Sequence, residues 1–271
     1  MREQNRTTIG EGGLLEGKRA FIAGVANDRS IAWAVAEAFK AEGAELAFSY
    51  PGAAMGERTI PLVKTLAPAA ILDMDVAKDE EIARAFAELG KVWPTFDILV
   101  HSIGYAPRSA LDGRFSEVTT REAWQITMDV SAYSLIALTR AAKPFMPRGG
   151  NVVCMTYYGA EKVVPNYNVM GVAKAALEAS ARYLAEDLGQ DNIRVNAISA
   201  GPLKTLAAAG IKGMRTMHKE NADKTPLKRN IEQEDVARAC LYLCSDLARN
   251  VTGEVLHVDA GQNILGVVSM G

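Results

Sequence analysis

Short runs rich in β-branched and aromatic residues alternate with helical stretches along almost the whole chain of 271 residues. This alternation predicts a parallel sheet with helices on both faces, because each parallel strand needs a crossover before the next one. We therefore expect an α/β fold, a Rossmann-like doubly wound sheet of seven parallel strands. The expected strands are Arg19–Val25, Glu45–Ser49, Ala70–Asp73, Phe96–Ser102, Asn151–Thr156, Ile193–Ala200 and Val255–Asp259.

Six helices are expected between these strands, with apolar residues on one side of each, as at Ile31, Val35 and Phe39. No internal repeat, low-complexity tract or Pro/Ser-rich linker divides the chain. We expect one Rossmann-type domain over residues 14–271 after a flexible arm at residues 1–13. The expected helices are Ile31–Glu42, Arg58–Leu66, Asp79–Leu89, Thr120–Met146, Asn166–Leu188 and Ile231–Cys244.

Composition excludes several classes of partner. A formal net charge of −2 gives no reason to expect nucleic acid. No apolar run reaches the roughly 18 residues that would span a bilayer, and the polar start does not resemble a signal peptide, so we expect a cytoplasmic location without membrane insertion. Three cysteines and three isolated histidines without ligand spacing predict no metal site.

The end of the first expected strand has some features of a dinucleotide site. A Gly-x-Gly-x-x-Gly fingerprint starting at Gly24 would need glycines where Ala26 and Arg29 stand, so the strict pattern fails. Gly24 still permits a tight turn. Ser30 is expected to cap the following helix, which would leave N–H groups near Ile31 facing a pyrophosphate.

Cofactor choice is predicted from the second and third strands. The second ends in Phe48-Ser49-Tyr50-Pro51, with neither an acidic residue for a ribose hydroxyl nor an adjacent arginine for a 2′-phosphate. We expect NADH rather than NADPH. Asp73 and Asp75 follow the third strand, where a carboxylate would either accept the adenine amino group or cap the next helix.

The pair Tyr167 and Lys174 is the main candidate for chemistry. Read as a helix opened by Pro165, their spacing of seven residues places both side chains on one face. An ammonium beside a phenol favours the phenolate, so we expect the pKa of Tyr167 to be lowered. The alternative is a buried tyrosine and a solvated lysine.

One long segment without clear regular structure, Gly201–Lys228, follows the sixth expected strand. Ligands of open α/β sheets bind beyond the carboxyl ends of the strands, and long loops in compact domains are usually functional or disordered. We interpret residues 203–228 as a substrate lid.

The chain resembles a known family, the short-chain dehydrogenase/reductases, and within it the NADH-dependent enoyl-acyl-carrier-protein reductases of bacterial type II fatty-acid synthesis. The resemblance runs from Leu14 to about Leu265. Ordinary members of the wider family would have tyrosine where Met170 stands, four residues before Lys174. The matching segments are Gly24-Val-Ala with Ser30-Ile-Ala32, His101-Ser-Ile-Gly-Tyr-Ala-Pro107, Tyr157 with Tyr167-Asn-Val-Met-Gly-Val-Ala-Lys174, Arg194-Val-Asn-Ala-Ile-Ser-Ala-Gly-Pro202 with Thr205, and Gly253-Glu-Val-Leu-His-Val-Asp259.

This resemblance implies a role for each matching residue. Tyr167 would bind the thioester carbonyl, Lys174 the nicotinamide ribose, and Tyr157 would help to place the substrate. The positions implied to touch the cofactor are Gly24, Ser30, Ile31, Asp75, Val76, Ser102, Ile103, Gly104, Lys174, Leu203 and Thr205. Those implied to face substrate are Tyr105, Ala106, Tyr157, Met170 and Met217.

The resemblance also implies a function. The expected reaction is NADH-dependent reduction of the trans-2 double bond of an enoyl thioester, with acyl carrier protein as partner and a homotetramer as the assembly. One alternative is a reductase of the same fold acting on a ketone or alcohol. Another is a non-catalytic NAD-binding sensor, although such a protein would commonly lose Tyr167 or Lys174.

Overall fold

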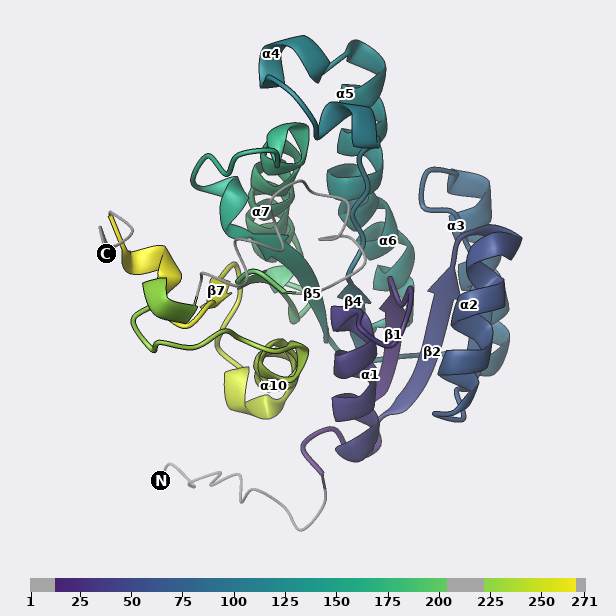
Figure 1. The fold of residues 1–271 in the computed structure, drawn as a ribbon. Helices are drawn as coiled ribbons and strands as arrows, with labels where there is room; N and C mark the ends of the chain where they lie inside the picture. The colour runs from purple at the N-terminus through teal and green to yellow at the C-terminus, as the bar shows by residue number, and fades with distance from the viewer. Residues whose placement is uncertain (1–12, 204–221, 267–271) are drawn as a thin grey trace.

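A seven-stranded, fully parallel sheet forms the centre of the protein, with the strand order β3-β2-β1-β4-β5-β6-β7 (Figure 1). The computed structural model describes residues 13–203 and 222–266. All seven strands predicted from the sequence are present. Their bounds are β1 Arg19–Ala23, β2 Glu45–Tyr50, β3 Ala70–Asp73, β4 Ile98–His101, β5 Gly150–Tyr157, β6 Ile193–Ala200 and β7 Val255–Val258.

Each face of the sheet has its own hydrophobic core. Successive residues of a strand point to opposite faces, so Phe21 and Ile22 of β1 enter different cores. Helices α1 and α10 pack together over one face, while α3, α6 and α7 cover the other. The helices are α1 Ile31–Ala41, α2 Gly52–Lys64, α3 Asp79–Val92, α4 Phe115–Val118, α5 Arg121–Met128, α6 Ser134–Ala142, α7 Asn168–Gly189 and α10 Gln233–Cys244.

The predicted helical stretch Thr120–Met146 is confirmed, with helical backbone from Arg121 to Phe145, but it is not one regular α-helix. A π-helical segment, Asp129–Tyr133, separates α5 from α6, and a short 3-10 turn, Lys143–Phe145, follows α6. Such π-helical turns occur mostly inside longer helices and are frequent at functional sites. Here the turn changes which side chains face the end of β4.

Helix α2 also begins earlier than predicted, at Gly52 instead of Arg58. The Gly52 N–H donates to Oδ1 of Asp73 at the end of β3, over 2.7 Å. A carboxylate accepting from a free N–H at a helix start stabilises that start. Its partner lies 21 residues away along the chain, so the local sequence pattern did not reveal it.

The strand order reverses between β1 and β4, which lie side by side and lead in opposite directions across the sheet. The Ser102 N–H, just after β4, donates to the Ala23 carbonyl at the end of β1. Ligands of doubly wound folds bind in the crevice at such a reversal. The predicted arm at residues 1–13 falls, except for Gly13, outside the described residues, as does most of the predicted lid. Among the helices of the two described ranges, none combines the length and apolar character that crossing a bilayer requires.

Candidate active site

The carboxyl edge of the sheet brings together the predicted cofactor positions that the structure describes. Gly24 follows β1, and Ser30 and Ile31 stand where α1 begins. Lys174 reaches this edge from α7, as shown below. Residues following β3, β4 and β6 complete the set: Asp75, Val76, Ser102, Ile103, Gly104 and Leu203. The remaining predicted position, Thr205, lies outside the described residues.

Gly24 allows two strand ends to approach closely. Its φ is +115°, which side chains rarely adopt, and a Cβ there would lie 2.6 Å from the carbonyl carbon of Ser102 and closer still to its oxygen. Only glycine fits this position without a shift of backbone. The exposed backbone at such a turn is what a dinucleotide pyrophosphate needs, so this part of the chain fits the expected cofactor.

Ser30 does not cap α1 as predicted. Its Oγ accepts hydrogen bonds from the N–H groups of Ala26 and Asn27, over 3.1 and 3.0 Å, and so folds the preceding loop back on itself. The first N–H groups of a helix have no intrahelical acceptor, and the helix dipole makes this end positive. The start of α1 therefore keeps the anion-binding character expected of it.

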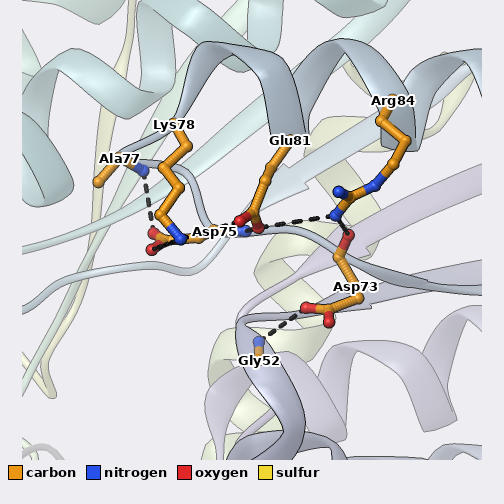
Figure 2. Close-up of polar contacts among 7 residues, drawn as sticks. All are labelled: Gly52, Asp73, Asp75, Ala77, Lys78, Glu81 and Arg84. Atoms are coloured by element: carbon orange, nitrogen blue, oxygen red, sulfur yellow. Dashed lines mark hydrogen bonds and ion pairs between the residues drawn. The ribbon is translucent and has the colours of Figure 1, made fainter.

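Asp73, the last residue of β3, and Asp75, two residues later, contact different partners (Figure 2). Asp73 is used at the start of α2, as described above. Asp75 Oδ1 accepts from the Ala77 N–H over 3.1 Å, and its other carboxylate oxygen lies 3.6 Å from the Lys78 ammonium. Lys78 also pairs with Glu81 at 2.9 Å. Because the Asp75 side chain stays partly exposed, it can still accept from a ligand.

Lys174 is buried, with 7% of its surface exposed, so the alternative of a solvated lysine is wrong. Its Nζ donates to the carbonyls of Met155 in β5, over 2.9 Å, and of Ile103 after β4, over 3.3 Å. A Cβ on Gly104 would lie 3.4 Å from the same nitrogen. An ammonium has three donors, so two hold the lysine in place and one remains for a ligand.

Tyr167 occupies the position just before α7, whose first residue is Asn168, so the helix does not open at Pro165 as predicted. The tyrosine is equally buried, with 7% exposed. Burial raises the pKa of Tyr167, and the nearby Tyr157 and Glu178 raise it further. The predicted lowering of this pKa is therefore wrong in the protein without ligand. Burial of the phenol is the largest influence, and burial also lowers the pKa of Lys174 to about 8.

The two predicted catalytic tyrosines face each other. The rings of Tyr157 and Tyr167 meet edge to face with centroids 4.9 Å apart. Burial raises the pKa of Tyr157 to about 12, so both phenols are neutral hydrogen-bond donors at neutral pH. The Tyr167 ring packs over two glycines: a Cβ on Gly159 would collide with it, and a Cβ on Gly171 would lie 2.8 Å from the Gly159 carbonyl oxygen.

The predicted substrate positions are partly assembled beside these rings. Ala106 and Met170 are buried in the same small cluster as Tyr167, with Tyr157 packed against it. Tyr105 is 55% exposed at the mouth of the site. Met217 lies outside the described residues.

Sequence reasoning missed two serines of the π-helical segment and its border. Ser131 Oγ accepts from the Tyr105 N–H over 2.8 Å and donates to the Tyr105 carbonyl over 2.9 Å. Ser134 Oγ lies 2.8 Å from Nε2 of His101, which burial keeps neutral by lowering its pKa to about 3. Two serines three residues apart inside an otherwise regular helical pattern are the signal that could have found them.

Chemically, the site combines neutral phenols with a fixed ammonium. A phenol can donate to a carbonyl oxygen on which negative charge gathers, and the ammonium can bind hydroxyl or anionic groups. No group of three or more potential metal ligands occurs within residues 13–203 and 222–266.

The chain matches a protein-family model described as enoyl-(acyl carrier protein) reductase over residues 24–263. It is 49% identical over 254 residues to the enoyl-acyl-carrier-protein reductase (NADH) FabI of Rickettsia prowazekii. The alignment covers 94% of this chain and 97% of that protein. The solved enoyl-acyl-carrier-protein reductase (NADH) of Aquifex aeolicus superposes with a TM-score of 0.91 at 49% identity, over 94% of this chain and 100% of that one. The reductase of Anaplasma phagocytophilum, solved in complex with NAD, superposes with a TM-score of 0.91 at 44% identity. The match covers 96% of this chain and 98% of that one.

Proposed function

This chain belongs to the enoyl-(acyl carrier protein) reductase family, and we propose that it reduces the trans-2 double bond of enoyl thioesters with NADH in fatty-acid elongation. It is an oxidoreductase, and its enoyl substrate is carried by acyl carrier protein. The observations that carry the proposal are the edge-to-face arrangement of Tyr157 and Tyr167 and a buried Lys174 that keeps one donor for a ligand.

Tyr167 is the proposed hydrogen-bond donor to the thioester carbonyl. Reduction of the β-carbon moves negative charge onto that oxygen, two carbons away, and a donor aimed there stabilises the charge as it develops. A raised pKa suits this role because the phenol keeps its proton until the oxygen becomes basic. Tyr157 limits where the acyl chain can lie, since its ring closes one side of Tyr167.

Lys174 is the proposed anchor for the cofactor ribose through its third N–H. The dihydronicotinamide, when bound, supplies the hydride. Gly24 and the start of α1 suit the pyrophosphate, and Asp75 keeps an accessible oxygen for the adenine. Ser131 holds the backbone of Tyr105, and with it the loop after β4, which carries Ser102 to Gly104.

We also propose a homotetramer in the cytoplasm. Large apolar side chains are exposed on α5, the π-helical segment and α7, at Trp124, Tyr133, Val172 and Tyr183. A run of exposed apolar residues on neighbouring helices supports packing between copies. Three buried cysteines without disulfides support a reducing compartment.

The test is reduction of crotonyl-CoA with NADH, followed by loss of the nicotinamide absorbance. Tyr167→Phe should lower kcat by about 100-fold or more, since it removes one donor to the developing charge, and leave NADH affinity unchanged. Lys174→Ala should chiefly weaken NADH binding. Tyr242→Phe, at an exposed tyrosine on α10 outside the proposed site, is the control and should act like the wild type. Normal turnover in both Tyr167→Phe and Lys174→Ala would refute the proposed roles.

A further inference from the structure

A buried carboxylate lies one helical turn beyond Lys174. Glu178 is only 6% exposed, and its Oε1 accepts a hydrogen bond of 2.7 Å from Oγ1 of Thr156, which is also buried. An ionised carboxylate in such a place is costly unless a positive charge or hydrogen bonds compensate it. The resemblance and the fold assign it no role, so its burial calls for an explanation.

Glu178 and Lys174 are held by adjacent residues of one strand. The Met155 carbonyl of β5 accepts from the Lys174 ammonium, and the next residue, Thr156, donates to Glu178. On α7 the two charged side chains are four residues apart, so their Cβ atoms lie about 5–6 Å from each other. Strand and helix thus fix a carboxylate and an ammonium as neighbours.

The other titratable groups that face Lys174 are neutral at neutral pH. Burial lowers the pKa of His101, at the end of β4, to about 3 and raises that of Cys154, in β5, to about 12. Against the effect of burial, Cys154 and then Glu178 raise the pKa of the ammonium, and the Cys154 thiol is itself uncharged at neutral pH.

Glu178 itself has four polar or charged neighbours, one on α7 and three from other parts of the fold. Thr156, Arg182 and His257 lower its pKa and Glu161 raises it, while burial, the largest influence, also raises it. Nε2 of His257, on β7, lies 2.6 Å from Oε1 of Glu161, so these two side chains are engaged with each other.

We propose that Glu178 is a positioning residue of the reductase, whose carboxylate keeps Lys174 in the ammonium form that binds the cofactor. The inference rests on the proposed function, because it assumes that Lys174 contacts NADH. It concerns a residue that touches neither substrate nor cofactor and acts through the lysine.

The experiment measures NADH affinity by fluorescence at pH values on both sides of the Lys174 pKa of about 8. Glu178→Gln keeps the shape and can still accept from Thr156, but it removes the charge. The affinity of E178Q should equal that of the wild type at low pH, where the lysine is charged in both. As the pH rises, the NADH affinity of E178Q should decrease at a pH about 1 unit or more lower than that of the wild type. The pH profile of crotonyl-CoA reduction should shift in the same direction.

Three further variants separate positioning from simple packing. Glu178→Asp, which retains the charge, should restore most of the wild-type profile, and Glu186→Gln, an exposed carboxylate on the same helix, should leave it unchanged. Thr156→Val, which removes the donor to Glu178, should shift the profile in the same direction as E178Q by a smaller amount.

A pH profile of E178Q that superposes on that of the wild type would overturn the inference. If E178Q fails to fold, an unchanged pH profile of T156V would overturn it instead. A wild-type protein that neither binds NADH nor reduces crotonyl-CoA would refute the proposed function instead.

Discussion

The contact between Gly159 and Tyr167 gives a sharp test of how the site is built. A Cβ at Gly159 would lie 2.8 Å from Cε1 of Tyr167, closer still to Cδ1, and 3.3 Å from Cδ1 of Tyr157. Carbon atoms in contact are normally about 3.5–4.0 Å apart, so Gly159→Ala should push the Tyr167 ring away by roughly 1 Å. A displacement of that size at a reacting centre costs on the order of 100-fold in rate.

The expected result for Gly159→Ala is therefore a kcat for crotonyl-CoA about 100-fold lower, with an unchanged Kd for NADH, because the cofactor positions are not touched. Strain of about 1–3 kcal/mol should also lower Tm by several degrees.

The control for this prediction is Gly189→Ala at the end of α7, where nothing lies within 4 Å of the added Cβ. This control should keep full activity and gain up to about 1 kcal/mol of stability. If Gly159→Ala kept the kcat of the wild type, Tyr167 would not need the position described here.

Three other predictions concern stability. Gly24→Ala, at a φ of +115° and against the Ser102 backbone, should lower the unfolding free energy by about 2–4 kcal/mol in urea titrations. Gly52→Ala, at a φ of +71° with open space around the added Cβ, should lower it by only about 1–2 kcal/mol. Equal losses in the two variants would refute the role of the close approach at Gly24. His101 has a pKa lowered from 6.5 to about 3, so the unfolded chain takes up a proton that the folded protein excludes. Stability should fall by up to roughly 1.4 kcal/mol per pH unit as the pH drops below 6.5, and His101→Gln should flatten that slope in acid titrations. Asp73→Ala should cost about 1 kcal/mol by removing the acceptor at the start of α2, while Asp73→Asn, which keeps an acceptor oxygen, should cost less in the same urea assay.

The strands were predictable because each is a short apolar run bounded by helical patterns, and their parallel order follows from the crossovers. The helical stretch Thr120–Met146 was predictable too, but its interruption was not, because a π-helical turn leaves the apolar pattern nearly intact while changing the backbone. The start of α2 was missed because Asp73, which stabilises it, comes from another strand. In each case the missing information lies in a contact between distant segments.

The site shows the same division. Spacing singled out Tyr167 and Lys174, both of which are buried in the structure, and the resemblance pointed to the loops around them. Spacing carries no information on burial, which is why the predicted direction of the Tyr167 pKa was wrong. Glu178 stood four residues after Lys174 in the sequence, where a glutamate on a helix is ordinarily exposed; only the fold reveals that it is buried.

The π-helical turn at Asp129–Tyr133 acts on the site through rotation. An α-helix advances about 100° per residue, and a turn with i to i+5 bonding accommodates an additional residue, which rotates α5 relative to α6 by about that angle. This phase change lets both Ser131 and Ser134 reach the end of β4, at Tyr105 and His101. Losing one residue from the turn would restore a regular helix and swing Ser131 away, so the length of this segment matters to the loop as much as its chemistry does.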